Sequence, residues 1–283
     1  MNVQVLANTH DELGEGLLWS PDDGAVYWVD IMLPTVRRMI LATGRVTSWP
    51  MPETIGWLVR RTGRDDFIAG LASGFAELSL APLQISLIGA PEPKLTNNRM
   101  NDATVDRDGR IWAGTMDVDA AGPSGSLYCM GADKTWTCHD TGYLVSNGPA
   151  ISRDQDWLYH TDSLARSIYR FAMHDDGTLG PRELHITFED AWGLPDGMTC
   201  DNEGGLWIAH WGGGRVSRFT PEGVLERSIA LPVTNVTNLV FAGPALDRLI
   251  ITSAASDVEE ELAGALFEAD PRVIGIPPYK FDG

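Results

Sequence analysis

The chain has 283 residues, of which 21 are Lys or Arg and 39 are Asp or Glu, so its formal net charge is −18. A chain this acidic is repelled by nucleic acids and by anionic membrane surfaces, and we expect neither as a partner. No apolar run approaches the roughly 20 residues that a membrane span requires. We expect a single domain that covers residues 1–283.

The predicted elements begin with a strand at residues 3–7, where apolar residues alternate with other residues. The first residues lack the basic and apolar regions of a secretory signal, which favours a cytoplasmic protein. The alternating residues need a partner, so we expect this strand to pair with the last sheet of the chain and cover its exposed edge.

A short polar turn followed by an apolar strand then recurs six times. Matching positions lie about 41 to 48 residues apart, which is the spacing of blade repeats; they are Val26, Phe67, Ile111, Leu158, Leu206 and Leu249. A second short strand follows each copy. Six copies predict an all-β protein, a six-bladed β-propeller. Within the last copy, the acidic residues 256–263 predict one surface turn of helix.

Polar side chains recur about ten or eleven residues before each matching position, a distance of one strand plus its turn. They are Glu15, Asn101, Asn147, Asp196 and Asn238, whereas the second blade has Gly56 and Trp57 there. Equivalent positions of successive propeller blades form a ring around the central channel. Asn and Asp also favour turns, so a purely structural role is the alternative.

The ring residues Glu15, Asn147 and Asp196 offer three oxygen ligands with a total charge of −2. That set suits one divalent cation, and oxygen ligands accept Ca, Mg, Mn, Zn or Fe(II). A bound cation can stabilise charge on a carbonyl oxygen, and a neighbouring carboxylate can take a proton from water. The sequence has no Gly-x-Ser-x-Gly nucleophile motif and no His-Glu-x-x-His zinc motif, so direct attack by water fits best.

Arg99 precedes Asn101 by two residues, and in an extended strand the two side chains point to the same side. Together they could hold the oxygens of a small polar substrate, although a surface salt bridge is an equal alternative for Arg99.

His160 and His210 follow strand cores, where a structural role is favoured over channel lining. We interpret the three cysteines, Cys129, Cys138 and Cys200, as reduced thiols in or near the core.

Four motifs carry a resemblance to a known family: Gly14-Glu15-Gly16, Asn97-Asn98-Arg99-Met100-Asn101-Asp102, Ser146-Asn147-Gly148 and Pro195-Asp196-Gly197-Met198. With these motifs the chain resembles the senescence marker protein (regucalcin)/gluconolactonase family, and within it the bacterial aldonolactonases of pentose and hexose oxidation. The resemblance implies a six-bladed propeller, in agreement with the repeat.

The resemblance also implies roles for individual residues. Glu15, Asn147 and Asp196 would hold a divalent metal, with Asp196 as the general base. Arg99 and Asn101 would contact a sugar lactone. Vertebrate members have a substrate-binding glutamate in this region, and the nearest match in this chain is Asp119, which is one methylene shorter.

The sequence therefore predicts a metal-dependent hydrolase that opens a sugar lactone, such as arabinono-, xylono- or gluconolactone, to its aldonic acid. Two alternatives stay open, because fold does not fix function. One is a calcium- or sugar-binding regulator without enzymatic activity. The other is a broader esterase or phosphotriesterase on the same propeller. Neither the metal nor the oligomeric state follows from the sequence.

Overall fold

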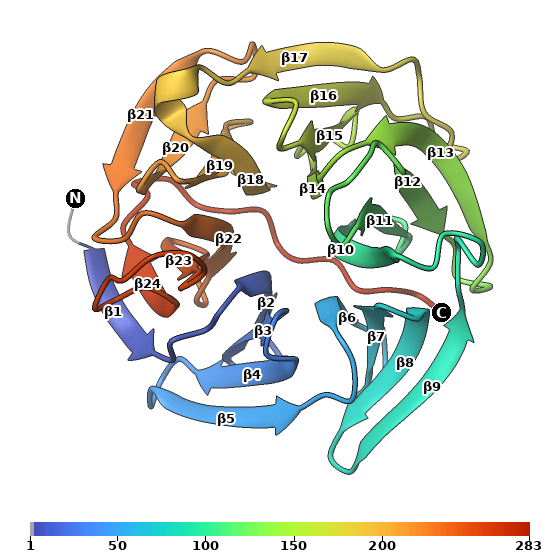
Figure 1. Cartoon of the computed structure of the whole chain (residues 1–283), viewed down its shortest axis with the longest axis horizontal. Helices are drawn as coiled ribbons and strands as arrows, with labels where there is room; N and C mark the ends of the chain where they lie inside the picture. The colour runs from blue at the N-terminus through green and yellow to red at the C-terminus, as the bar shows by residue number, and fades with distance from the viewer. Residues whose placement is uncertain (1–2) are drawn as a thin grey trace.

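A computed structural model describes residues 3–283. Its strands form six four-stranded antiparallel sheets, which Figure 1 shows as blades around a central channel. The predicted six-bladed β-propeller is confirmed. Among the described residues, no helix is long and apolar enough to cross a membrane.

The chain forms the blades one after another, and the first strand of each lies innermost. The first blade contains β2 (Gly14–Ser20), β3 (Ala25–Asp30), β4 (Thr35–Ile40) and β5 (Arg45–Pro50). The second contains β6 (Ile55–Arg60), β7 (Phe67–Leu71), β8 (Gly74–Leu80) and β9 (Leu83–Gly89). The third contains β10 (Asn98–Val105), β11 (Ile111–Asp117), β12 (Gly125–Met130) and β13 (Trp136–Tyr143).

The remaining blades follow the same order. The fourth contains β14 (Ser146–Ile151), β15 (Trp157–Asp162), β16 (Ser167–Ala172) and β17 (Glu183–Thr187). The fifth contains β18 (Leu194–Cys200), β19 (Leu206–Trp211), β20 (Arg215–Phe219) and β21 (Leu225–Ala230). The sixth contains β22 (Val236–Ala242), β23 (Arg248–Ser253), β24 (Ala265–Ala269) and, from the start of the chain, β1 (Val3–Asn8).

The two ends of the sheet-forming chain meet in the sixth blade. Strand β1 pairs with β24 in antiparallel register, with Val3 opposite Ala269 and Asn8 opposite Ala265. Figure 1 shows β1 as the outermost strand of that blade. The prediction for residues 3–7 is thus confirmed, and the ring of blades is held closed by main-chain hydrogen bonds.

The helical turn predicted for residues 256–263 is wrong. This segment is a series of turns, and the helical element of the described chain is a short 3-10 turn, η1 (Asp190–Trp192). Backbone donors at the start of the segment are used elsewhere, since the Ser256 N–H donates to the Glu12 carbonyl at 3.1 Å. The Glu260 carboxylate accepts from the Thr234 N–H at 2.8 Å. These tertiary bonds outweigh a weak helical preference.

The hydrophobic core is divided into clusters that lie between neighbouring blades. Large aromatic side chains fill them, among them the fully buried Trp28, Trp112 and Trp207. Because each blade packs mainly on its neighbours, the channel at the centre is free to carry polar side chains.

The three cysteines are free, and Cys129 and Cys200 are buried as expected. Cys138 lies on the edge strand β13 and is exposed, so its predicted core position is wrong.

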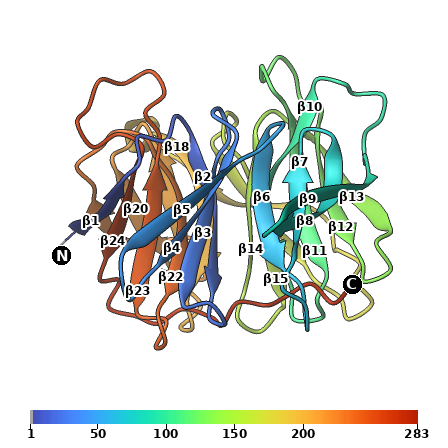
Figure 2. The same cartoon turned by 90° about the horizontal axis from the view of Figure 1, so that it is seen from below.

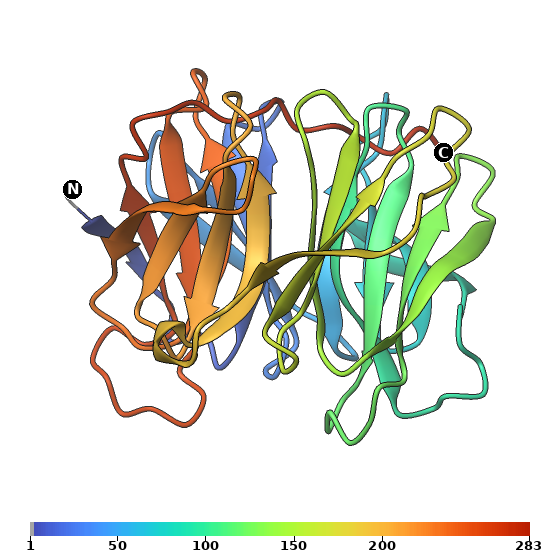
Figure 3. The same ribbon diagram turned by 90° about the horizontal axis from the view of Figure 1, so that it is seen from above.

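After β24 the chain crosses one face of the propeller. Figure 1 shows this C-terminal segment passing over the channel, and Figures 2 and 3 show it running along a single face of the disc. Gly275 forms a bridge with Asp201 of the fifth blade, and Phe281 forms a parallel bridge with Arg61 next to the second. Phe281 is fully buried between the second and third blades. The segment therefore covers one end of the channel.

Candidate active site

The six innermost strands all break their regular pairing near their first residues. A register shift lies at or beside the predicted ring position in each of them, for example between Glu15 and Leu18 in β2 and between Asn147 and Ala150 in β14. A β-bulge adds one residue to a strand and re-aims the neighbouring side chains. The bulges release the ring residues from strict alternation and let them face the channel.

Glycines directly after two of the ring residues permit this local geometry. Gly16 and Gly148 have φ values of 58° and 55°, in the left-handed region that favours glycine. A Cβ atom on Gly16 would lie 2.5 Å from the Gly56 carbonyl oxygen of the next blade. A side chain at Gly16 would therefore push apart the strands that hold Glu15.

Four of the predicted site residues form one hydrogen-bonded chain across three blades. Arg99 Nη1 donates to Asn101 Oδ1 at 2.6 Å, which confirms that the two side chains share a side. Asn101 Nδ2 donates to Asn147 Oδ1 at 3.2 Å. Asn147 Nδ2 in turn donates to Asp196 Oδ1. All four side chains are buried, so a surface salt bridge is excluded for Arg99.

Asn238 holds two further carboxylates on the other side of the ring. Its Nδ2 donates to Glu15 Oε2 at 2.9 Å and to Asp102 Oδ2 at 3.3 Å. Its Oδ1 accepts from the Leu239 N–H at 2.7 Å, which fixes the orientation of the amide. Asn238 therefore sets the spacing between Glu15 of the first blade and Asp102 of the third.

Asp102 is a site residue that the sequence reasoning missed. It directly follows Asn101, and in a regular strand neighbouring side chains point to opposite faces. The register shift between Met100 and Ala103 breaks that alternation. The signal that could have identified Asp102 is that a second oxygen-bearing side chain directly follows the ring position Asn101.

The buried carboxylates perturb one another. Burial, followed by the charge of Asp102, raises the pKa of Glu15 to about 8. Burial raises the pKa of Asp102 to about 7, and burial together with Glu15 and Asp102 raises the pKa of Asp196. Burial lowers the pKa of Arg99 to about 10, which leaves it charged near neutral pH. The charge of Arg99 interacts with Glu15 and Asp196, while Asp102 adds a third carboxylate that acts on both. A further cation would stabilise this arrangement.

The carboxylate and amide groups of the ring are of the kinds that bind a divalent cation. Within residues 3–283, no three His, Cys, Asp or Glu side chains converge to hold a metal. A metal between Glu15 and Asp196 therefore needs the Asn147 amide as its third ligand. Asn147 directs its Nδ2 toward Asp196, so ligation by Oδ1 requires this amide to turn. Carboxylate and amide oxygens match the preference of Ca, Mg and Mn.

The other predicted residues lie away from this cluster. Asp119 is on the exposed loop after β11, where its Oδ2 accepts from Asn97 Nδ2 at 3.1 Å. His160 and His210 are fully buried, in agreement with the structural role that we favoured. His160 Nε2 bonds Ser146 Oγ at 2.9 Å directly behind the Asn101 contact, and His210 Nδ1 bonds the Trp192 carbonyl at 2.8 Å.

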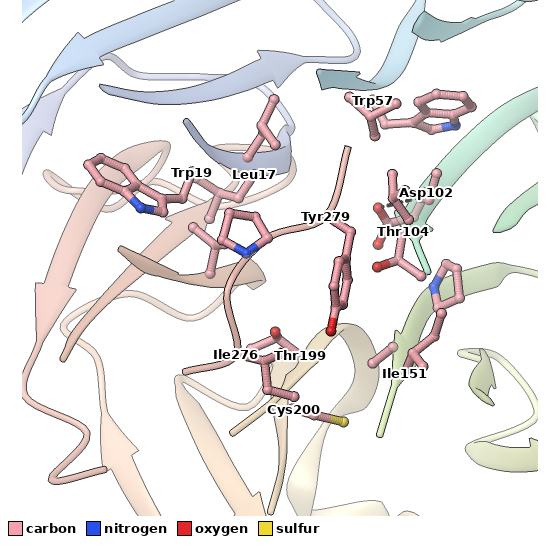
Figure 4. Close-up of a pocket in the computed structure, with 18 of the residues that line it drawn as sticks. Leu17, Trp19, Trp57, Asp102, Thr104, Ile151, Thr199, Cys200, Ile276 and Tyr279 are labelled. Atoms are coloured by element: carbon pink, nitrogen blue, oxygen red, sulfur yellow. Dashed lines mark hydrogen bonds between the residues drawn. The ribbon is translucent and has the colours of Figure 1, made fainter. Parts of the chain in front are cut away.

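Below the ring, the channel contains a cavity of about 140 Å³. Asp102 and the later residues of the inner strands line it, and the C-terminal residues 276–279 cover it. Figure 4 shows the Tyr279 ring in this cavity near Thr104 and Thr199. Because the ring residues begin the inner strands, they lie toward the opposite, uncovered face. A substrate would therefore approach the carboxylates from that face.

Comparison with known proteins shows the family to which the chain is similar. Residues 13–255 match the model of the SMP-30/gluconolactonase/LRE-like region. The chain is 32% identical to a pentonolactonase from Haloferax volcanii over 100% of this chain and 99% of that protein. It is 33% identical to a 6-deoxy-6-sulfogluconolactonase from Pseudomonas putida, over 96% and 95% of the two chains. The structure of a calcium-binding protein, regucalcin, from Agrobacterium tumefaciens superposes with a TM-score of 0.93 at 26% identity, over 99% and 97% of the two chains.

Proposed function

Because the chain belongs to the SMP-30/gluconolactonase/LRE-like family, we propose that it is a hydrolase that opens a sugar lactone to its aldonic acid with the help of one divalent metal ion. The observation that carries the proposal is the buried cluster of Glu15, Asp102 and Asp196 beside a single Arg99. Such a cluster destabilises the fold and is kept where chemistry requires it. The lactonase names of the relatives support the substrate class, and the regucalcin relative supports a metal.

The proposed roles follow from the contacts. Glu15, Asn147 and Asp196 would hold the ion, which when bound withdraws electron density from the lactone carbonyl. Asp196 would accept a proton from the attacking water, because its buried carboxylate lies in the ring beside the proposed ion. Arg99 and Asn101 would orient the lactone oxygens from one side.

A serine nucleophile is the mechanistic competitor, because Ser146 and His160 form a hydrogen-bonded pair. Both side chains are 0% exposed, so neither can reach a substrate. The Ser146 carbonyl accepts from Asn101 Nδ2 at 2.7 Å. The pair therefore supports the ring from behind, and direct attack by water remains the better mechanism.

We also propose that residues 1–283 act as one propeller domain in a reducing, cytoplasmic compartment. The exposed free thiol of Cys138 supports this location, since such a thiol is readily oxidised outside the cell. An aldonolactone of the pentose and hexose oxidation routes is the substrate that we expect.

The test measures the hydrolysis of a panel of aldonolactones, phenyl acetate and a phosphotriester. A pH indicator reports the acid released, and each assay is run with each divalent metal and with a chelator. Spontaneous ring opening is subtracted. We expect metal-dependent opening of five- or six-carbon aldonolactones, and a raised Michaelis constant in Arg99→Ala. Faster turnover of the ester or phosphotriester without lactone opening would contradict the substrate assignment. Metal binding without any hydrolysis would instead favour a binding protein.

A further inference from the structure

A second cavity, of about 230 Å³, adjoins the ring at the seam between the second and third blades. The turn at residues 72–74 and the connection at residues 90–96 border it, on the uncovered face where β8 and β10 begin. Arg99 lines this cavity and also donates to Asn101 in the ring. A molecule held by Arg99 can therefore extend from the ring into the cavity.

Part of the otherwise largely apolar wall of this cavity is polar, and hydrogen bonds link Glu92 in it to its neighbours. Glu92 Oε1 accepts from Thr115 Oγ1 at 3.0 Å and from Tyr128 OH at 3.1 Å. Glu92 Oε2 accepts from Asn98 Nδ2 at 2.8 Å. A carboxylate offers about four acceptor positions, so about one remains for a ligand. A hydroxyl donor is the complementary group for that position.

The charge of the wall also restricts the ligand. Glu92 is the acidic lining residue and Arg99 the basic one. The Arg99 charge interacts with Glu15 and Asp196 on the ring side, so the cavity end of the wall is dominated by the Glu92 carboxylate. An anionic group placed there would be repelled, whereas a neutral hydroxyl group would be accepted.

We propose, on the basis of the proposed lactone hydrolysis, that this cavity binds the exocyclic carbon chain of the lactone through its hydroxyl groups and that Glu92 rejects chains that end in an anion. The substrate class is then a neutral aldonolactone with a hydroxylated chain outside the ring. The ring residues act on the lactone carbonyl, and the cavity selects among lactones.

The experiment compares kcat/KM for three 1,4-lactones: a tetronolactone without an exocyclic carbon, gluconolactone with a neutral two-carbon chain, and glucarolactone with the same chain ending in a carboxylate. Glu92→Gln should raise the glucarolactone to gluconolactone ratio by about 10- to 100-fold, because one like charge is removed. Glu53→Gln is the matched control. Glu53 binds the N–H and Oγ of the neighbouring Ser73 but does not line the cavity, so its removal should leave the ratio unchanged.

A second variant keeps the inference testable if Glu92→Gln folds poorly. Ala72 is an exposed lining residue, and Ala72→Leu should lower kcat/KM for gluconolactone by about tenfold while leaving the tetronolactone unchanged. An unchanged ratio in Glu92→Gln, or equal effects of Ala72→Leu on all lactones, would overturn the subsite while lactone hydrolysis stands. A wild-type protein that opens no lactone would overturn the proposed function and the subsite together.

Discussion

Three buried aspartates outside the ring are each neutralised by an arginine, whereas the carboxylates in the ring are crowded together. In three blades a buried aspartate accepts hydrogen bonds from a tryptophan indole and an arginine Nε; the sets are Asp11 with Trp28 and Arg37, Asp106 with Trp112 and Arg110, and Asp201 with Trp207 and Arg218. In the ring, Glu15 and Asp102 instead share the Asn238 amide, Asp196 accepts from Asn147, and the charge of Arg99 acts on both Glu15 and Asp196. The same residue type thus stabilises the blades in one region and destabilises the channel in the other.

The acids that stabilise the blades are therefore different residues from the acids proposed for the reaction. A paired buried charge is costly to break, while an unpaired one is costly to keep. Each of these aspartates is paired with a tryptophan and an arginine of one blade. The stability of the blades therefore does not depend on the residues in the channel. The channel can then keep an excess of negative charge that a cation or a reacting water can use.

The largest effect should come from Asp196→Asn. Asparagine keeps an oxygen ligand but cannot accept a proton from water, so turnover of an aldonolactone should fall by about 100- to 10,000-fold. The fold should be retained, because the change removes a buried charge. Single-turnover and steady-state rates, measured with circular dichroism as a folding control, test this. Near-normal turnover would show that a different group activates the water.

Asp201→Asn should have the opposite profile. Arg218 would lose its fully buried carboxylate partner, which it contacts at 2.6 Å, and would keep only Glu203 and Glu226. The free energy of unfolding should fall by about 3 kcal/mol, as measured by urea titration. Turnover per folded molecule should stay unchanged. A loss of turnover without a loss of stability would erase the distinction between the two regions.

Asn238→Ala tests whether the amide donors organise the ring. It removes the donor shared by Glu15 and Asp102, and loss of such an outer contact typically weakens metal binding by about 10- to 100-fold. Calorimetric titration with Ca²⁺ or Mn²⁺ measures this. The matched control is Asn235→Ala, which removes a buried amide that donates to the Ser256 carbonyl at 2.9 Å. Equal metal affinity in the two variants would limit Asn238 to a structural role.

The raised pKa values predict a pH dependence of the metal-free protein. Glu15 shifts from 4.5 to about 8 and Asp102 from 3.8 to about 7, so the folded chain binds more protons than the unfolded chain between these limits. Their contribution to the free energy of unfolding is therefore full in acid and is lost as the pH rises toward 8. Metal-free Glu15→Gln should lose less stability than the wild type between pH 5 and pH 8 in thermal scans. Parallel curves would mean that Glu15 ionises normally, and added metal should restore the wild type at pH 8.

The sequence predicted the features that repeat and missed those that depend on local distortion. The blade count, the closing strand β1 and the contacts among Arg99, Asn101, Asn147 and Asp196 follow from regular spacing. Asp102 enters the channel through a bulge, which spacing alone does not reveal. The helical turn at residues 256–263 failed because its polar groups bond to distant segments.

The smallest predicted effect belongs to Asp119, which lies outside both groups of buried acids. Its loop is exposed, and its contacts are with Asn97 Nδ2 and, through its own N–H, the Asp117 carboxylate at 2.9 Å. Asp119→Glu adds one methylene at the rim and should shift the order of preferred lactones by a few-fold, while the rate with the best substrate stays nearly constant, because one methylene changes fit more than chemistry. The lactone panel, run on wild type and variant side by side, measures this. An identical order of preference would remove Asp119 from the substrate site and leave selection to the ring and the cavity beside Arg99. A large fall in turnover with every lactone would instead place Asp119 with the channel carboxylates. The group of acids needed for the reaction would then extend beyond the channel to the exposed loop after β11.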